Sequence, residues 1–358
     1  MVMIARSPLR LSLGGDGTDL PAYYKRHGGL VISTTISYHV YTILTTGSPN
    51  GVQIISADYS AYRQQPTCED LIWNGDLRLP KAIARYFNVH DELTIFLASQ
   101  IPPGTGLGLS GSLAVSMIKA LAFWCGLDLG PMDVAELACQ IEIEELEMPV
   151  GKQDQYTAAF GGLNCLRFSR AGVTVEPLQI SDETHRALER GLMLFFTGAS
   201  RRSSTILQQQ NLASQQGDRA TICKLDAIKE LALEMRATLV EQDLEAFGDL
   251  LHRSWMQKRQ LTDGITNPFL DQCYKTAREE GALGGTLTGA GGGGFLMLYC
   301  PEEHQDNVTQ ALTDMGLQHQ PFTLQNGGVE VMQATTSPQP MGNDRVSLVM
   351  EGVAVDTE

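Results

Sequence analysis

The sequence predicts an α+β fold in two domains, and three observations carry this prediction. Residues 3–56 alternate short strand-like runs with turns, which indicates a sheet of mostly antiparallel neighbours. Residues 204–260 have the apolar spacing of long helices and lead into a mixture of strands and helices. The chain has 358 residues, 43% of them hydrophobic, which is enough to bury two cores. We expect domains over 1–180 and 181–332, followed by a polar tail over 333–358.

Runs of strand composition and segments of helical spacing alternate through the first half. The strands are expected at 3–13, 31–36, 40–45, 52–56, 93–98, 163–168 and 173–177. The helices are expected at 79–87, 113–124, 131–146 and from about 153 to 160. Residues 47–51, Gly-Ser-Pro-Asn-Gly, are typical of a hairpin turn and would join two successive strands.

The second half begins with residues 181–190, which are typical of a connector. The helical region from about 204 to 260 is expected to break near 216–217 and 242–243. Asn267 as N-cap and Pro268 at the first helical position predict a helix that runs to 280. The remaining strands are expected at 192–196, 295–299, 320–323 and 328–332, with a helix at 302–315.

Charge and composition exclude several classes of partner. The formal net charge of -15 argues against nucleic acid and anionic membrane surfaces, because both require a basic footprint. The chain has no signal-peptide pattern and no stretch of about eighteen uncharged apolar residues, so we expect a cytoplasmic protein without membrane contact. Its cysteines are scattered singly without a CxxC pair, which favours reduced core thiols over disulfides or zinc.

Residues 101–112 form a glycine-rich loop between a predicted strand and a predicted helix. Glycines adopt positive φ and let a backbone approach phosphate oxygens, and the N–H groups of a helix N-terminus favour negative charge. The loop therefore predicts a phosphate-binding site. It is neither a Rossmann fingerprint, since no strand ending in an acid follows at the required distance, nor a GxxxxGK[ST] P-loop. A second glycine-rich loop, 283–294, leads into a strand.

Four acidic residues have both a structural and a functional interpretation. Asp16 and Asp19 lie in a glycine turn, where they either cap local N–H groups or bind a ligand. Glu142 belongs to an acidic run of the kind that usually forms a solvated helix face, but it follows the apolar Ile141 and can point inward. Asp154 is expected in the first turn of a helix, where an acid either caps the helix or takes part in catalysis.

Four motifs, in order, resemble those of the GHMP small-molecule kinase superfamily. They are Pro8 to Asp19 (PLRLSLGGDGTD), Pro102 to Ser110 (PPGTGLGLS), Gly151 to Gln155 (GKQDQ) and Thr288 to Gly294 (TGAGGGG). The resemblance covers about residues 3–332 and leaves the tail outside. Within the superfamily, residues 28–36, 151–156 and 197–201 are most similar to the D-glycero-D-manno-heptose 7-phosphate kinases.

This resemblance implies a two-domain α+β fold with the active site in the cleft between the domains. It implies ATP as phosphate donor and Mg²⁺ as cofactor, with Glu142 and either Ser110 or Ser112 as the metal ligands. Asp154 would accept the proton of the attacking hydroxyl, and Arg10, unless it forms only a surface ion pair, would stabilise developing charge. The residues that would bind the nucleotide are Pro103, Gly104, Gly106, Leu107, Gly108, Ser110, Gly111 and Ser112.

The implied acceptor is a small-molecule sugar or sugar phosphate, best matched by D-glycero-D-manno-heptose 7-phosphate and phosphorylated at its anomeric hydroxyl. The residues expected to contact it are Asp16, Thr18, Asp19, Gly289, Gly291 and Arg201, the last together with Arg202 and Lys25 for a phosphate group. Two departures from the family pattern stand out. Leu109 and Gly111 interrupt the usual Gly-Ser-Ser-Ser run, and Asp16 replaces a glycine that is common in the heptose kinases.

Other interpretations of the same motifs stay open. The acceptor is alternatively another sugar or a cyclitol, as in galactokinase-like and fucokinase-like enzymes, or the chain is a related decarboxylase that uses ATP. A non-catalytic sugar or nucleotide sensor on the same fold would lack the base, whereas Asp154 is present. The sequence leaves the oligomeric state open, with a homodimer among the possibilities.

Overall fold

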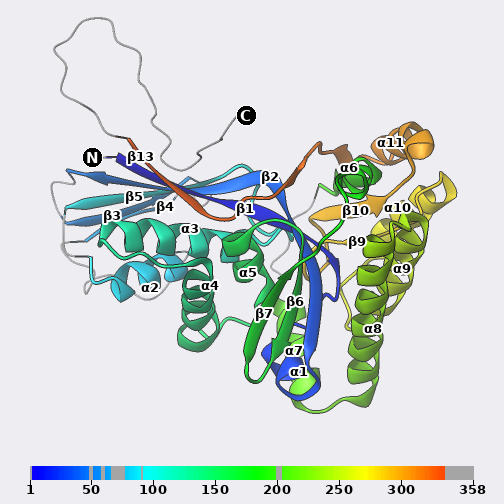
Figure 1. The fold of residues 1–358 in the computed structure, drawn as a ribbon, viewed down its shortest axis with the longest axis horizontal. Coiled ribbons are helices and arrows are strands. Elements are labelled where there is room, and N and C mark those ends of the chain that lie inside the picture. The colour runs from blue at the N-terminus through cyan, green and yellow to red at the C-terminus, as the bar shows by residue number, and fades with distance from the viewer. Residues whose placement is uncertain are drawn as a thin grey trace, which may run out of the picture.

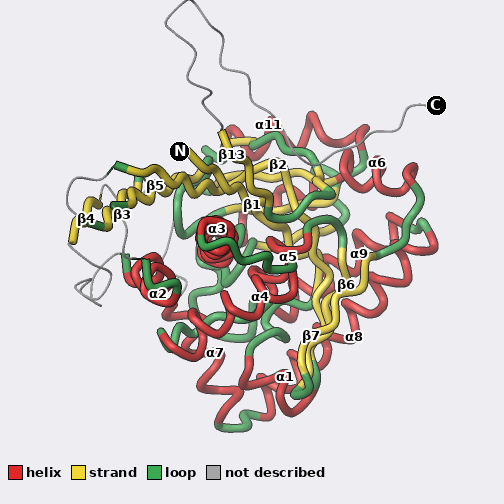
Figure 2. The backbone as a smooth tube through the Cα atoms, turned by 60° about the vertical axis from the view of Figure 1, so that its left-hand side comes forward, coloured by secondary structure: helices red, strands yellow, loops and turns green. Residues whose placement is uncertain are grey.

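A computed structural model describes residues 2–47, 51–57, 61–65, 77–89, 92–198 and 204–334. Within these residues the chain forms a nine-stranded sheet and a four-stranded sheet, both flanked by helices (Figures 1 and 2). This mixture of helices and largely antiparallel sheets confirms the predicted α+β class. The described tail ends at Ala334, so most of the predicted tail lies outside the described residues.

The first sheet is built around one long strand, β2. Its strands are β1 (Val2–Gly14), β2 (Gly29–Thr46), β3 (Val52–Ser56), β4 (Ala61–Gln65), β5 (Leu93–Ser99), β6 (Asn164–Ser169), β7 (Gly172–Pro177), β12 (Leu324–Gln325) and β13 (Glu330–Ala334). β1 runs antiparallel along most of β2, while β6 pairs with the beginning of β2 and β5 with its end. The two strands predicted at 31–36 and 40–45 are therefore one, because residues 37–39 lie at a bulge opposite Pro8 and not in a turn.

The predicted hairpin between β2 and β3 is wrong. The strand order is β13-β1-β2-β5-β3-β4, so β5 lies between them and runs parallel to β3. Turn residues show where a chain reverses but not which strand it pairs with next, and β5 brings alternate buried residues, Leu93, Ile95 and Leu97, to an inner position. Residues 48–50 of the predicted turn lie outside the described residues.

Helices cover one face of the first sheet, and α3 lies at their centre (Figure 1). The helices of this half are α1 (Pro21–His27), α2 (Arg78–Tyr86), α3 (Leu109–Trp124), α4 (Pro131–Cys139) and α5 (Gln153–Phe160). Figure 2 shows α3 nearly end-on under the strands. It begins four residues earlier than predicted, because Gly108 adopts the left-handed conformation directly before Leu109. The glycine loop therefore runs straight into the helix.

The predicted helix at 131–146 has two parts. The α-helix α4 ends at Cys139, and Gln140–Glu145 continue as a π-helical segment. Such wide turns are rare and occur often at functional sites. Here the wider turn places Glu142 in the interior, fully buried, while Glu144 and Glu145 stay towards solvent.

The second half forms the smaller sheet and its helices. Its strands are β8 (Leu192–Phe196), β9 (Gly284–Leu287), β10 (Phe295–Tyr299) and β11 (Gln318–His319), in the order β11-β8-β10-β9. Its helices are α6 (Asp182–Gly191), α7 (Ser204–Gln215), α8 (Arg219–Glu241), α9 (Leu244–Lys258), α10 (Pro268–Glu279) and α11 (Gln305–Asp314). The breaks near 216 and 242 and the Asn267 cap, which accepts from the Leu270 N–H, are confirmed.

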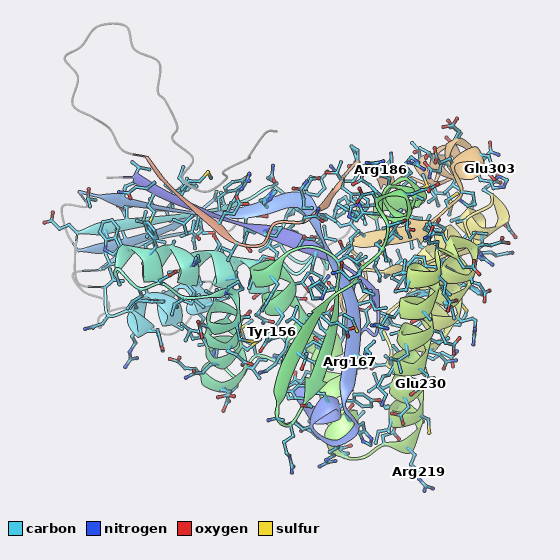
Figure 3. All side chains as sticks on the ribbon, in the orientation of Figure 1. Tyr156, Arg167, Arg186, Arg219, Glu230 and Glu303 are labelled. Atoms are coloured by element: carbon cyan, nitrogen blue, oxygen red, sulfur yellow. The ribbon has the colours of Figure 1, made fainter. Side chains whose placement is uncertain are left out.

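The segment predicted as a connector at 181–190 is instead helix α6, on which Figure 3 labels Arg186. The Ser181 hydroxyl accepts a hydrogen bond from the Thr184 N–H, and two acids occupy the first turn. Both features stabilise a helix start. The cap signal is therefore present in the sequence, and the prediction of a connector is wrong.

The two halves share a hydrophobic core. α8, along which Figure 3 labels Arg219 and Glu230, packs its Ala232 and Met235 against Gly14 of β1, with no room for a side chain at that glycine. β12 and β13 return from the second half to pair with β2 and β1. Among the described residues, no helix has the length and apolar character to cross a membrane. The domain boundary at 180 stays a prediction.

Candidate functional site

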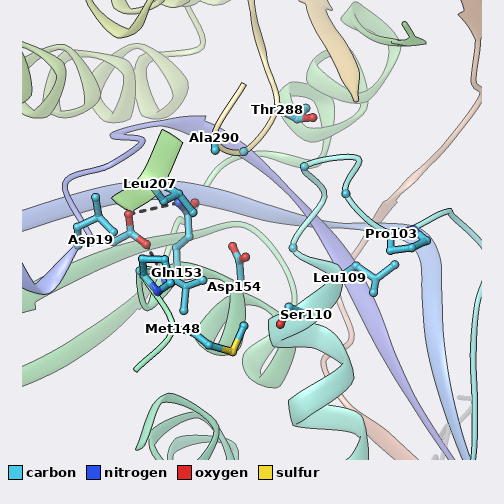
Figure 4. A pocket seen from close by; sticks show the side chains of 18 of the residues that line it. Asp19, Pro103, Leu109, Ser110, Met148, Gln153, Asp154, Leu207, Thr288 and Ala290 are labelled. Atoms are coloured by element: carbon cyan, nitrogen blue, oxygen red, sulfur yellow. Dashed lines mark hydrogen bonds between the residues drawn. The ribbon is translucent and has the colours of Figure 1, made fainter. Parts of the chain in front are cut away.

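A cavity of about 760 Å³ lies between the two halves and collects most of the residues that the sequence singled out. Its wall includes the first glycine loop, the turn after β1, the start of α5 and the second glycine loop (Figure 4). The predicted site residues in this wall are Arg10, Asp16, Asp19, Pro103, Gly104, Gly106, Gly108, Ser110, Asp154, Gly289 and Gly291. Motifs far apart in the sequence therefore meet at one place.

The two glycine loops are in close contact at Gly106 and Gly289. A Cβ atom on Gly106 would lie 2.4 Å from the Thr288 carbonyl oxygen, and one on Gly289 would lie 2.8 Å from the Gly106 Cα. Both glycines have positive φ, +82° and +61°. The Thr288 hydroxyl donates to the Thr105 carbonyl at 3.0 Å and ties the loops together. Glycine is therefore required in each loop for this contact.

The first loop ends at the N-terminus of α3, where Ser110 stands in the first turn. Unpaired backbone N–H groups and the helix dipole make such a terminus favourable for an anion. Gly104, Gly106 and Gly108 all have positive φ, which shapes the loop for close approach of a ligand. The geometry therefore fits a phosphate cradle.

Behind Ser110 lies Glu142, which is fully buried. The Ser110 Oγ donates to Glu142 Oε1 at 2.5 Å, and Gln155 Nε2 donates to Glu142 Oε2 at 2.7 Å. Burial raises the pKa of Glu142 to about 7, although the two hydrogen bonds act in the opposite direction. A buried carboxylate next to a hydroxyl, both hard oxygen donors, fits a divalent cation such as Mg²⁺.

Several predicted residues contribute to the framework and do not form the cavity wall. Ser112 is fully buried and donates to the Pro8 carbonyl at 2.8 Å, so Ser110, and not Ser112, accompanies Glu142. The Thr18 hydroxyl donates to the Gly15 and Leu30 carbonyls at 2.8 and 2.9 Å. The Leu107 carbonyl accepts from the Arg10 N–H at 3.1 Å.

Asp154 stands in the first turn of α5, next to Arg10 of β1. Its Oδ1 accepts from Arg10 Nε at 2.8 Å and lies 2.7 Å from Nη2, while Arg10 Nη1 donates to the Gly106 carbonyl at 2.6 Å. Arg10 is 3% exposed, so the alternative of a surface ion pair is wrong. Gly111 lets α3 approach, since its Cβ would lie 2.6 Å from the Asp154 Cβ. Figure 4 shows Asp154 between Gln153 and Ser110.

Asp19 is buried at the other side of Gln153. Its Oδ2 accepts from the Gln153 N–H at 3.0 Å, which caps the start of α5, and its Oδ1 lies 3.4 Å from Gln153 Nε2 (Figure 4). Burial raises the pKa of Asp19 to about 6, against the effect of the Gln153 backbone hydrogen bond. A Cβ on Gly151 would lie 1.9 Å from Asp19 Oδ2, so glycine is needed there.

Asp16 has a partner that sequence reasoning missed. Lys258, at the end of α9, donates to Asp16 Oδ2 at 2.7 Å, and it also contacts the Leu287 carbonyl at 2.7 Å and the Thr286 hydroxyl at 3.4 Å. Lys258 shares one face of α9 with the buried Leu251 and Trp255, since these positions recur at helical spacing. A lysine on an apolar face was the available signal for a buried acidic partner.

Of the three residues predicted to contact a substrate phosphate, only Lys25 lies within the described residues. Arg201 and Arg202 lie outside the described residues. Lys25 is exposed on α1 and is not part of the cavity wall. Lys258 and Arg78, which were not singled out, are further cations in that wall.

Both halves of the chain match known families. Residues 77–162 match the GHMP kinases N terminal domain, and residues 235–317 match the GHMP kinases C terminal. The first glycine loop, Glu142 and Asp154 lie in the first match, and Lys258 and the second glycine loop lie in the second. Asp16 and Asp19 precede both matches.

Two known proteins resemble the chain over most of its length. The D-glycero-alpha-D-manno-heptose 7-phosphate kinase of Campylobacter jejuni is 32% identical over 333 residues, which are 91% of this chain and 97% of that protein. The L-fucokinase/L-fucose-1-P guanylyltransferase of Bacteroides fragilis is 26% identical over 83% of this chain but only 34% of its own length. The second similarity is therefore confined to part of a larger protein.

Solved structures show the same relationship. A D-glycero-D-manno-heptose 1-phosphate kinase from Bacteriodes thetaiotaomicron has a TM-score of 0.76 and 26% identity, covering 93% of this chain and 100% of that one. A putative sugar kinase from Campylobacter jejuni has a TM-score of 0.75 and 31% identity, covering 92% and 98%. Since sequence and fold agree over nearly the whole length, the chain belongs to the GHMP kinases and is a phosphotransferase that acts on a sugar hydroxyl.

Proposed function

We propose that the protein transfers the γ-phosphate of ATP to the anomeric hydroxyl of a heptose 7-phosphate. The observation that carries this proposal is Asp154, held by Arg10 in the cavity between the glycine loop and the two buried acids Asp16 and Asp19. The heptose 7-phosphate kinase of Campylobacter jejuni, which aligns with 91% of this chain, supports this choice of acceptor.

The nucleotide fits the side of the cavity formed by the first glycine loop. Gly104, Gly106 and Gly108, with Ser110 at the helix N-terminus, offer the backbone groups that hold phosphate oxygens. The adjoining wall is apolar and suits an aromatic base; it includes Leu77, Leu79, Pro80, Leu97 and Leu113. We place the phosphates of ATP at the loop and its base against these side chains.

Ser110 and Glu142 are the residues that would hold Mg²⁺. Two protein oxygens are fewer than the roughly six ligands that this ion takes, so water and phosphate oxygens would complete the set. Bound there, Mg²⁺ would neutralise charge on the phosphates. Glu142 must lose its proton to act as a ligand. Because its pKa is raised to about 7, binding of Mg²⁺ at this place should depend on pH near neutrality.

Asp154 would act as the base. Arg10 holds its Oδ1, which leaves Oδ2 to accept the proton of the attacking sugar hydroxyl. As that oxygen bonds to the γ-phosphorus, the bond from phosphorus to the bridging oxygen of ADP breaks. Arg10 also donates to the Gly106 carbonyl, so one side chain fixes the base relative to the phosphate loop.

The sugar would lie against Asp16 and Asp19. Carboxylates accept hydrogen bonds from sugar hydroxyls, and both side chains are in the cavity wall. Arg201 stays our candidate for the phosphate group of the sugar. Reversing its charge should raise the KM for a sugar phosphate, and an unchanged KM would remove Arg201 from this role.

The direct test of the base is Asp154→Asn. The amide keeps the shape and the contact with Arg10 but cannot accept the proton, so kcat should fall by about 10²- to 10⁴-fold while the ATP dissociation constant changes by less than about 3-fold. Turnover is measured as ADP release with heptose 7-phosphate, and ATP binding by calorimetry. Asp128→Asn, at a fully exposed acid, is the matched control. An Asp154→Asn variant with near-normal kcat would exclude Asp154 as the base.

A further inference from the structure

Three side chains in the cavity wall have a hydrogen-bonding atom that lacks a partner among the described residues. They are Asp16 Oδ1, Gln153 Oε1 and Gln210 Nε2. The exposed fractions of these three residues are 9%, 7% and 4%. Leaving a polar atom buried and unpaired costs about 1–3 kcal/mol. All three residues line the same cavity, and a ligand that pairs with these atoms would recover that free energy, which indicates a recognition site.

Gln210 comes from α7, which neither the motifs nor the predicted site includes. It lies directly over the glycine turn after β1, because a Cβ on Gly17 would lie 2.2 Å from Gln210 Nε2. Gly17 has a φ of +85° and forms part of the same cavity wall. α7 therefore brings an amide donor against the turn that carries Asp16 and Asp19.

Lys258 fixes the orientation of Asp16 at this place. An ammonium group has three hydrogen-bond donors, and those of Lys258 face Asp16 Oδ2, the Leu287 carbonyl and the Thr286 hydroxyl. Lys258 thus directs its contacts to the protein, and the second oxygen of Asp16, Oδ1, has no hydrogen-bond partner among the described residues. We regard Lys258 as a positioning residue.

Charge decides which part of a sugar phosphate fits there. Asp16 and Asp19 carry two carboxyl groups and Lys258 one ammonium, so the surroundings of Gln210 repel a phosphate group when both acids are ionised. A hydroxyl group donates one hydrogen bond and accepts others. Neutral hydroxyls therefore match two free acceptors and one free donor better than an anion does.

We infer that Gln210 is a specificity-determining residue that binds a hydroxyl on the non-reacting part of the sugar, together with Gln153 Oε1 and Asp16 Oδ1. This inference rests on the proposed function and adds to it the orientation of the sugar in the cavity. The hydroxyl-bearing carbons face Gln210, and the phosphate group of the sugar points away from it.

The test compares Gln210→Met with Gln208→Met on heptose 7-phosphate and on its deoxy analogues, each lacking one hydroxyl. Met keeps the length of Gln without its polar atoms, and Gln208 is exposed on the same helix outside the cavity wall. With Gln210→Met, kcat/KM for the parent sugar should fall about 10-fold through KM, with the KM for ATP unchanged. For one deoxy analogue, the ratio of the wild-type kcat/KM to the kcat/KM of Gln210→Met should fall to about 1, because the hydroxyl that Gln210 binds is already missing.

A ratio that is the same for every analogue, or no loss on the parent sugar, would overturn the assignment of Gln210. Gln210→Glu, which replaces the donor by an acceptor, is the second variant and should show the same loss if Gln210→Met does not fold. A wild-type protein that phosphorylates none of the sugars would overturn the proposed function and this inference together. The wild-type result therefore separates the two failures.

Discussion

The two ends of the cavity are built in different ways. One end, which we call the phosphate end because we propose that the phosphates of ATP bind there, consists of Gly104, Gly106, Gly108 and Ser110, with Glu142 behind Ser110. The acid end consists of Asp16, Asp19, Gln153, Gln210 and Lys258. The first is shaped mainly by the backbone of one loop, whereas the second depends on side chains from four separate segments.

This difference has an energetic consequence. The phosphate end needs glycine at particular φ angles and at close contacts. The free-energy cost of this geometry is confined to the loop itself. At the acid end, Asp16 and Lys258 are separated by 242 residues and are both nearly buried, so each depends on the other being in place. We therefore expect substitutions at the acid end to lower stability more than those at the phosphate end, and we expect the acid end to contribute more to substrate specificity.

The largest expected effect is at the acid end. Lys258→Met leaves the Asp16 carboxylate buried without its partner and should lower the free energy of unfolding by about 3–5 kcal/mol. Urea denaturation measures this value. The double variant Asp16→Asn with Lys258→Met should be more stable than Lys258→Met alone, since no unpaired charge remains. Equal stability of the two variants would show that the ion pair does not hold this end together.

The next largest effect is a pH dependence of stability that Glu142 causes at the phosphate end. The pKa of Glu142 is about 7 in the folded chain against 4.5 as its ordinary value, so the folded state holds the proton more tightly and stability falls as pH rises from 4.5 through 7. Glu142→Gln removes this loss, so its stability relative to wild type should improve by at most about 3 kcal/mol between pH 4.5 and pH 8 without Mg²⁺.

Denaturation midpoints of both proteins across this pH range are the measurement. Gln155, whose Oε1 is unpartnered among the described residues, can turn to accept from the new amide. Asp19 titrates in both proteins, so its contribution cancels. A stability difference that does not vary with pH would contradict the assignment of the titration to Glu142.

The smallest effect tests the contact between the glycine loops. Gly106→Ala and Gly126→Ala both place a side chain at positive φ, +82° and +72°, but only Gly106 faces a neighbour, while Gly126 has open space. Gly106→Ala should therefore cost about 1–2 kcal/mol more than Gly126→Ala and should also raise the KM for ATP. Equal costs would mean that only backbone strain acts at Gly106.

The two ends also differ in how far the sequence could predict them. The phosphate end lies in one continuous motif, and the predicted loop, helix and cavity residues of that motif are close in the structure. The choice of Ser110 over Ser112 could not be made, because it depends on which hydroxyl reaches Pro8 after folding. At the acid end, Asp16 and Asp19 lay in a visible motif, but Lys258 and Gln210 come from helices without one.

The same limit applies to the fold. The class and most helices follow from local periodicity, cap residues and glycines, which act over a few residues. The pairing of β3 with β5, and the return of β12 and β13 to the first sheet, are set by contacts between distant segments. Local turn chemistry does not determine such pairings.

The central claim is phosphate transfer to the anomeric oxygen of a heptose 7-phosphate. The most direct measurement is ³¹P NMR of the protein with Mg-ATP and D-glycero-D-manno-heptose 7-phosphate, beside mannose, galactose, fucose and a cyclitol in separate samples. We predict a new anomeric phosphate signal with the heptose 7-phosphate alone, together with the signals of ADP. A phosphorylated product from one of the neutral sugars and none from the heptose 7-phosphate would contradict the claim.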